Sequence, residues 1–219
     1  MPTRTTRPIA LLPFLCLLLV LAAGCGRRAT VAAPFPPEAS LAVAGFTQPQ
    51  YTWQLLAGYI PEQRTMVETD ALVDLDRLLI AQLLKDKDRH LLGPSTTRQC
   101  QELATFDQKA GRGAALKYWT EVGRCLPADY LLVPQLMDMR ERQGSSKSVK
   151  TPAAVAFDFY VIDVAQGELL ARYHFDEKQM SLADNLLDIG KFFSRGGRWL
   201  TADELATEGI TQGLKELGL

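Results

Sequence analysis

Few residues of this chain could perform acid and base chemistry near neutral pH. The two histidines are His90 and His174, and neither has a second histidine or a cysteine at a spacing that binds metal ions. His174 alternates with Arg172 and Asp176, a grouping that could transfer protons, but the polar side of an exposed strand explains the same pattern better. We therefore expect the histidines to be structural.

The carboxylates give no stronger indication of catalysis. Asp158 and Asp163 lie on one expected strand with an odd spacing, so their side chains leave opposite faces and cannot act as a pair. A Gly-x-Ser-x-Gly motif is absent from the sequence. We expect no catalytic residues, no metal site and no cofactor, and hence a protein that is not an enzyme.

Two cysteines, Cys100 and Cys125, lie in the part of the chain that we expect to fold. In an oxidising compartment they can form a disulfide if their Cα atoms come within about 7 Å. A bridge closing a loop of about 25 residues would stabilise the fold by roughly 3 kcal/mol. Two unpaired buried thiols are the alternative, and the sequence leaves this choice open.

The amino terminus has the layout of a secretory signal. Arg4 and Arg7 precede an apolar run over residues 9–23, which Pro13 interrupts and which ends in small residues. A membrane-spanning helix is the alternative, but it needs about 20 apolar residues, more than this run supplies. We expect residues 1–24 to be a cleaved signal peptide.

Cys25 follows the small residues directly, in the sequence LAAGCGRR. This stretch resembles the lipobox of bacterial lipoproteins, although Leu21 lies one position further from the cysteine than the favoured leucine. The resemblance implies that the Cys25 sulfur carries a diacylglycerol, that cleavage falls before Cys25, and that the new amino terminus is acylated. Two or three acyl chains hold a protein firmly at a membrane, whereas one holds it reversibly. The alternative is an ordinary buried thiol.

The residues after Cys25 bear on which membrane is used. In Gram-negative lipoproteins an aspartate after the lipidated cysteine retains the protein at the inner membrane, and Gly26 in that place favours the periplasmic face of the outer membrane. The stretch that follows holds three prolines and no helix or strand period, so we expect residues 25–39 to be an extended linker. Arg27 and Arg28 either contact anionic head groups or are merely solvated.

Composition indicates one globular domain. The chain is 47% hydrophobic and 22% charged, which is typical of a folded protein. Beyond the expected signal peptide it carries 22 basic and 25 acidic residues, so no basic surface for nucleic acid is indicated. We expect a single periplasmic domain over residues 40–219.

Period-two alternation predicts two long neighbouring strands, over residues 155–162 and 169–175. On the first strand the side chains that point one way are those of Val155, Phe157, Phe159 and Val161. The apolar face should be covered by helices, whereas the mixed face should be free to meet water or a partner. The residues of this possible partner face are Asp158, Tyr160, Ile162, Arg172 and His174.

Three further strands are expected over residues 41–46, 90–93 and 128–139. Pro134 lies in the last of these, which predicts a sheet edge or a bulge there. Residues 140–150 are polar and predict a mobile connection.

Apolar residues at helical spacing and capping signals predict five helices. Their ranges are 70–85, 97–109, 114–125, 181–193 and 201–217. The predicted fold class is therefore α/β: a single domain with a mixed β-sheet of about five strands and helices packed mainly on one face.

Three stretches carry a family resemblance: AVAGF (42–46), ADYLLV (128–133) and FYVIDVAQGELL (159–170). They resemble the strands of periplasmic lipoproteins related to the curli secretion channel and the penicillin-binding-protein activator, a group that shares a fold with the amino-terminal domain of TolB. The resemblance implies an envelope adaptor or assembly factor. Pore formation does not carry over, because the membrane-inserting hairpins of the channel have no counterpart in this sequence.

The function expected from the sequence is a lipid-anchored, non-enzymatic scaffold or assembly factor that binds other envelope proteins and can form a homo-oligomer. The mixed sheet face and residues 140–150 are the expected contact regions. The alternative is a small-molecule-binding lipoprotein, in which Tyr51, Trp53, Tyr118 and Trp119 would line one cleft.

Overall fold

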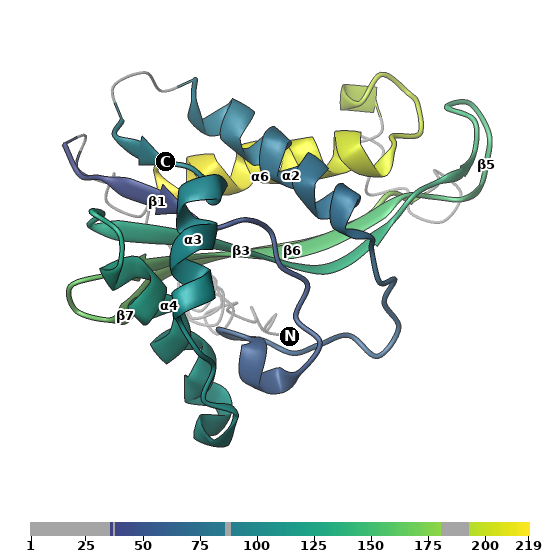
Figure 1. Ribbon diagram of the computed structural model, residues 1–219. Helices are drawn as coiled ribbons and strands as arrows, with labels where there is room; N and C mark the ends of the chain where they lie inside the picture. Colours follow the sequence, from purple (N-terminus) through teal and green to yellow (C-terminus); the bar gives the residue numbers. More distant parts are fainter. Residues whose placement is uncertain (1–35, 37, 86–88, 181–192) are drawn as a thin grey trace, which may run out of the picture. The chain divides into compact units, whose positions relative to one another are not determined.

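The computed structural model describes residues 36, 38–85, 89–180 and 193–219, which form an α/β domain (Figure 1). The five strands of its main sheet follow the order β2-β1-β3-β6-β7. They are β1 (Leu41–Val43), β2 (Leu91–Leu92), β3 (Tyr130–Arg140), β6 (Ala154–Asp163) and β7 (Glu168–Lys178). β1 is parallel to β2 and β3, whereas β3, β6 and β7 are antiparallel to one another. The predicted mixed sheet of about five strands is confirmed.

The alternation predicted for the two long strands is also confirmed. Four side chains of β6 lie in one hydrophobic core: Val155, Phe157, Phe159 and Val161. Tyr160 and Ile162 lie in a second core on the opposite face. Both faces of β6 are buried because chain segments cover the sheet on both sides.

The first face is covered by the two longest of the described helices, α2 (Thr69–Leu83) and α6 (Ala202–Leu217) (Figure 1). The predicted capping box begins α6, since Thr201 Oγ1 accepts from Glu204 N at 3.2 Å and Thr201 N donates to Glu204 Oε2 at 2.9 Å. Gly213 lets α6 approach β7, because a Cβ there would lie 2.5 Å from Cδ1 of Tyr173.

The second face is covered by α4 (Ala114–Arg124), with α3 (Pro94–Leu103) and the short helices η1 (Thr52–Gln54) and η2 (Gln108–Gly113) near it. The predicted start of α3 at Thr97 is wrong. Pro94 begins the helix, since its fixed φ and missing N–H suit the first helical position. Thr97 instead lies buried within the helix, where its hydroxyl donates to the Val43 carbonyl at 2.8 Å.

Pro134 lies in a central strand, because β3 pairs with both β1 and β6, so the prediction of a sheet edge is wrong. Pro134 has no N–H to donate, but this removes no ladder hydrogen bond to β1, because β1 ends at Val43. On that side Pro134 uses its carbonyl instead, which accepts from Thr47 N at 3.3 Å. The bulge of β3 lies a little further on, between Leu136 and Asp138.

Residues 140–150 do not form an irregular connection. The chain makes a hairpin there, with β4 (Gln143–Gly144) antiparallel to β5 (Val149–Thr151). Polar composition concealed this hairpin, because both of its short strands are largely exposed and show no apolar alternation. The predicted helix over residues 181–193 lies outside the described residues, apart from Phe193.

Candidate functional site

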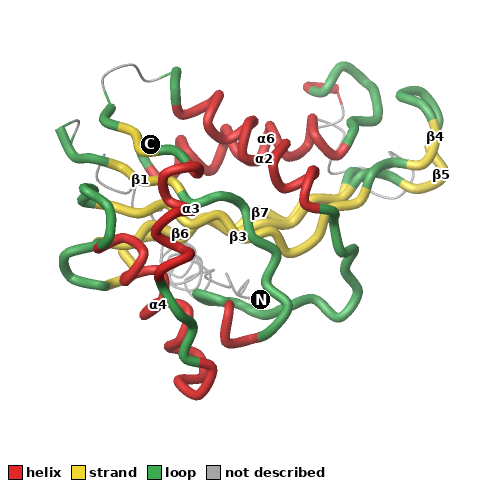
Figure 2. The backbone as a smooth tube through the Cα atoms, in the orientation of Figure 1, coloured by secondary structure: helices red, strands yellow, loops and turns green. Residues whose placement is uncertain are grey.

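The segment between β1 and α2 crosses the second face of the sheet, and we call residues 47–67 the strap. Apart from η1 it has no regular structure (Figure 2). Its first residue joins β3, since Thr47 N donates to the Pro134 carbonyl and Leu136 N donates to the Thr47 carbonyl at 2.8 Å. Leu55 then packs with Met137 and Ala156 in a small buried cluster between the strap and the sheet.

Two buried side chains of the sheet bind the middle of the strap. Gln135 is 1% exposed; its Nε2 donates to the Gln54 carbonyl at 2.8 Å and its Oε1 accepts from Leu56 N at 3.3 Å. The Tyr160 hydroxyl donates to the Ala57 carbonyl at 2.8 Å. Burial raises the pKa of Tyr160, and the neighbouring Asp158 carboxylate raises it further, so the hydroxyl stays protonated and able to donate.

The bulge of β3 fastens the far end of the strap. It places Asp138 opposite Ala156, so the carboxylate points to the strap face of the sheet. Asp138 Oδ1 accepts from Thr65 N at 2.8 Å, while Arg140 Nε donates to Oδ2 at 2.8 Å. Within the strap, Gln48 binds both Thr65 and Val67 through its side-chain amide.

A charged cluster lies under the strap at Gly58. Asp158 is 2% exposed, and its Oδ1 lies 2.9 Å from Arg172 Nε and 2.9 Å from His174 Nδ1. The Arg172 guanidinium also lies over the ring of Tyr160, 5.7 Å from its centroid. Gly58 has φ +85°, and a Cβ there would lie 3.0 Å from Arg172 Nη2, so this close contact favours glycine.

The expected partner face is only partly accessible. Asp158, Tyr160 and Ile162 are buried, because the strap and α4 lie over the face that the sequence led us to expect at the surface. Arg172 and His174 retain more exposure, with side chains 36% and 50% exposed. We therefore correct this prediction: three of the five residues are buried beneath the chain's own segments and are not available to a partner.

The predicted aromatic residues form a continuous row. Tyr51 stacks on Trp53 with ring centroids 5.5 Å apart, and Trp53 meets Phe106 edge-on at 5.1 Å. Phe106 stacks on Tyr118, which meets Trp119 edge-on at 5.1 Å. The row begins at the exposed Tyr51 and ends at the buried Trp119. Phe106 also belongs to the row, although the sequence analysis identified only the other four aromatic residues.

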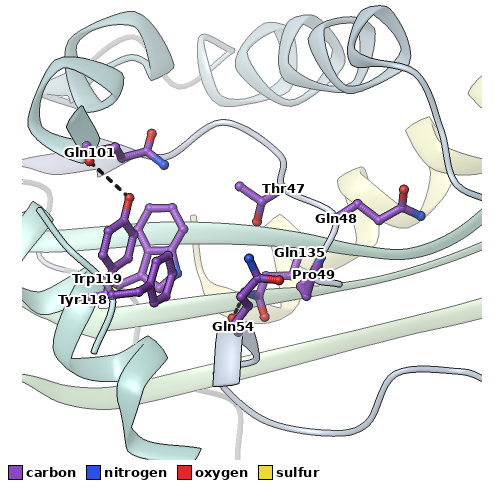
Figure 3. Close-up of a pocket in the computed structure, with 9 residues that line it drawn as sticks. Thr47, Gln48, Pro49, Gln54, Gln101, Tyr118, Trp119 and Gln135 are labelled. Atoms are coloured by element: carbon purple, nitrogen blue, oxygen red, sulfur yellow. Dashed lines mark hydrogen bonds between the residues drawn. The ribbon is translucent and has the colours of Figure 1, made fainter. Parts of the chain in front are cut away.

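A small pocket of about 100 Å³ lies between the buried end of this row and the strap (Figure 3). Tyr118 and Trp119 form one side of it, and the amides of Gln54 and Gln135 lie on the other. The buried indole Nε1 of Trp119 has no hydrogen-bond partner among the described residues. The four aromatic residues do not line one cleft, because Tyr51 and Trp53 do not line this pocket.

Cys100 and Cys125 are joined as a disulfide in the structure, with their Cα atoms 5.8 Å apart. The bridge connects α3 to the C-cap of α4, and Cys100 is buried. It thus connects the two helices beside the aromatic row.

Three further points concern metal binding, membrane-spanning helices and the amino terminus. No group of three or more His, Cys, Asp or Glu side chains in residues 36, 38–85, 89–180 and 193–219 is arranged to hold a metal ion. Within the same ranges no helix combines the length and the apolar character needed to cross a bilayer. Cys25, Arg27 and Arg28 lie outside the described residues.

Sequence reasoning missed the polar residues that position the strap. Gln135 and Asp138 occur within the otherwise apolar run of β3 and are both buried. A buried polar group must find a hydrogen-bond partner, so their presence in such a run was a usable signal. The sequence could not show that this partner is the backbone of residues 54–65.

Comparison with known proteins identifies no family for this chain. No family model matches it, and no curated protein matches it. Among solved structures it is similar to the PelC L103M dodecamer from Paraburkholderia phytofirmans, with 14% identity and a TM-score of 0.49, over 86% of this chain and 95% of that one.

Two further solved structures show weaker similarity. The LpoB C-terminal domain from Salmonella enterica has 12% identity and a TM-score of 0.39, covering 68% of this chain and 88% of that one. Lipoprotein GNA1162 from Neisseria meningitidis has 12% identity and a TM-score of 0.39, covering 73% and 95%. Identities and TM-scores this low carry no argument about function, which must rest on the chain's own residues.

Proposed function

We propose that this chain is a lipoprotein anchored through Cys25 at the periplasmic face of the outer membrane, where it binds another envelope protein without catalysing a reaction. The contact surface in this proposal is the outer side of the strap. The observation that carries the proposal is the exposed aromatic surface of the strap, where Tyr51 and Tyr59 are 57% and 75% exposed and Tyr51 stacks on Trp53. Tyrosine and tryptophan are enriched in protein interfaces.

The attachment of the strap supports this role. Its inner side is held by Gln135, Tyr160 and Asp138, so its backbone is fixed before any partner arrives. Binding then costs little ordering of the chain, which favours affinity for a given contact area. The exposed side chains of Tyr51 and Tyr59 project from a backbone that the sheet already positions.

The sequence at the amino terminus supports the anchor. The signal layout and the lipobox-like LAAGCGRR together indicate export and lipidation, and Gly26 favours the outer membrane. A protein tethered in this way meets partners within reach of the membrane surface.

A small-molecule binding role at the pocket beside Trp119 has one observation in its favour, the unpartnered Trp119 Nε1. A larger hollow of about 430 Å³ is lined by Thr52 and residues 55–60 of the strap itself, which belong to the proposed contact surface. However, the pocket beside Trp119 holds about 100 Å³, well below the ~300–1,000 Å³ of typical small-molecule sites. Its size suits a single side chain or an ordered water cluster better, which is compatible with a protein partner. We therefore keep protein binding as the proposed function.

Site-specific photocrosslinking in intact cells tests the contact surface. A photoreactive phenylalanine derivative replaces Tyr51 or Tyr59 in the full chain, and Gln212, exposed on α6, serves as the control position. We expect one adduct of the same mass from both strap positions, none from Gln212, and loss of the Tyr59 adduct when Trp53→Ala is added. Equal adducts at all three positions, or adducts from Gln212 alone, would contradict the proposal.

The anchor is tested separately with Cys25→Ser. We expect the Cys25→Ser variant to keep its leader. In the wild type, we expect mass spectrometry of the amino terminus to show acyl chains on Cys25. A wild-type chain with an unmodified amino terminus would refute the anchor and leave the crosslinking result as independent evidence on the strap.

A further inference from the structure

A hollow of about 340 Å³, which we call the α4 hollow, lies between α4 and the turn that joins β6 to β7. Lys117, Thr120 and Arg124 line it from α4, and Gln166 and Gly167 line it from the turn. The three α4 residues follow one another at spacings of three and four, so they lie on one face of the helix. The volume lies within the ~300–1,000 Å³ of typical small-molecule sites.

Three donor side chains of the α4 hollow have no protein partner. Thr120 is 6% exposed, and its buried Oγ1 has no hydrogen-bond partner among the described residues. Lys117 and Arg124 are exposed, and neither forms an ion pair in that part of the chain. A buried hydroxyl normally has a hydrogen-bond partner, so Oγ1 is a group that a ligand of the hollow would satisfy.

Two of these donors lie beside one point at Gly167. A Cβ on Gly167 would lie 3.5 Å from Arg124 Nη2 and 3.7 Å from Thr120 Oγ1, with Thr120 Cγ2 at 3.1 Å. Because Gly167 has φ +68°, the turn favours glycine here and no side chain fills this space. A ligand seated beside Gly167 can therefore reach both donors.

The donors of the α4 hollow suit a phosphate group. The guanidinium of Arg124 and the ammonium of Lys117 only donate, so they favour an anion. A phosphate group offers several acceptor oxygens, and both cations are common partners of phosphate in proteins. Glu121 also lines the hollow, so two cations are set against one carboxylate. A phosphodiester, which carries one negative charge, neutralises this set of groups.

The α4 hollow lies at the end of the sheet where the expected linker enters the domain. Ser40, the residue before β1, donates through N and Oγ to Asp129 Oδ2 at 2.8 Å and 2.7 Å. Val164 N, at the start of the turn, donates to the Asp129 carbonyl at 3.0 Å. Arg124 and Asp129 also line a second hollow in common. The start of β1, the turn and the end of α4 are therefore neighbours (Figure 1).

We propose that the α4 hollow binds the phosphodiester of a phospholipid head group, so that α4 and the turn between β6 and β7 rest on the membrane surface. The choice of a lipid rests on the anchor at Cys25 proposed above. A linker over residues 25–39 spans at most ~50 Å, which keeps this end of the domain close to the bilayer. The affinity of the hollow for a phosphodiester does not depend on the anchor.

A soluble probe tests the chemistry of the hollow. The full chain in maltoside micelles is titrated with dimethyl phosphate, and binding is followed by phosphorus NMR of the probe. Arg124→Gln and Thr120→Val should each weaken binding roughly fivefold, since each removes one hydrogen-bond donor. Thr120→Val should stay folded, because it removes a buried hydroxyl that has no partner among the described residues.

Lys215→Gln makes the same change of charge as Arg124→Gln but lies exposed on α6, and it should leave binding unchanged. Acetate should displace dimethyl phosphate poorly. No binding of dimethyl phosphate, equal affinity in all three variants, or equally strong displacement by acetate overturns the proposal.

Reconstituted vesicles of phosphatidylglycerol test the lipid as the source. A photoreactive phenylalanine derivative at Gln166, which is exposed in the turn, should form a phospholipid adduct that Arg124→Gln diminishes. The same derivative at Gln212 on α6 should form none. Probe binding without a lipid adduct overturns the lipid proposal and assigns the hollow to a soluble phosphodiester. An unmodified Cys25 would refute the anchor, whereas the titration with dimethyl phosphate would still decide the chemistry of the hollow.

Discussion

The buried carboxylate of Asp76 fixes the backbone at Phe46, between the end of β1 and the start of the strap. It lies within α2 and is 8% exposed. Its Oδ1 accepts from Phe46 N at 2.6 Å, while Arg98 Nη2 lies 3.8 Å from Oδ2. Burial raises the pKa of Asp76, although the Phe46 hydrogen bond and the Arg98 charge lower it in part. The carboxylate therefore positions the chain at a cost in solvation.

Two substitutions separate these effects. Asp76→Ala leaves Phe46 N without its acceptor and should lower the free energy of unfolding by about 1–3 kcal/mol at neutral pH. Asp76→Asn keeps an acceptor oxygen without the buried charge, so its free energy of unfolding at neutral pH should equal or exceed that of the wild type. Urea denaturation measures both.

The pH dependence has a definite sign. The folded state binds the Asp76 proton more tightly than the unfolded chain does, so this group contributes stability that is present at low pH and is lost as the pH rises through the folded-state pKa. Any advantage of Asp76→Asn should shrink as the pH falls toward about 4, the ordinary range of a carboxyl pKa. An advantage that grows on acidification would show that Asp76 is not the group responsible.

At the scale of elements, the contact between α6 and β7 depends on small residues. A Cβ at Gly213 would lie 2.5 Å from Cδ1 of Tyr173 and 3.0 Å from Cδ2 of Phe159. Both rings are buried, so neither can move aside freely. The helix therefore lies closer to the sheet than a side chain at this position would permit.

Gly213→Ala should lower the free energy of unfolding by about 1–3 kcal/mol despite the better helix propensity of alanine, because overpacking opposes it. Gln212→Ala, one residue away on the exposed side of α6, should change it by less than about 0.5 kcal/mol. Thermal unfolding followed by circular dichroism compares the two. Equal stabilities for the two variants would mean that α6 can shift outward without loss.

The elements differ in how far local sequence determines them. The alternation on β6 and β7 and the capping box of α6 predicted those elements correctly, since each pattern arises from residues near one another in the chain. The strap could not be predicted, because Gln135 and Gln54 are 81 residues apart and nothing local to either records their contact. Tyr160 and Ala57 are 103 residues apart, and this separation likewise concealed the burial of Tyr160 and the true extent of the partner face.

At the scale of the whole molecule, the disulfide stabilises the fold mainly by restricting the conformations of the unfolded chain, and less by the contacts it makes in the folded state. Cys100 and Cys125 close a loop over a sequence separation of 25 residues, which corresponds to about 3 kcal/mol of stabilisation through lost unfolded-state entropy. Cys100→Ser/Cys125→Ser should lower the free energy of unfolding by about that amount, and reducing agent should have the same effect on the wild type only. Two free thiols in the native protein, found by alkylation and mass spectrometry, would show instead that the bridge does not form.

The central position of β6 has a consequence for how the domain opens. Nine of its ten residues are buried, and it pairs with a strand on each side. Its amide hydrogens should therefore exchange with solvent only when the entire fold is lost, whereas those of the strap, which is attached through a few side-chain hydrogen bonds, should exchange through local detachment. Rare local openings can thus involve the strap alone, while the sheet beneath stays intact.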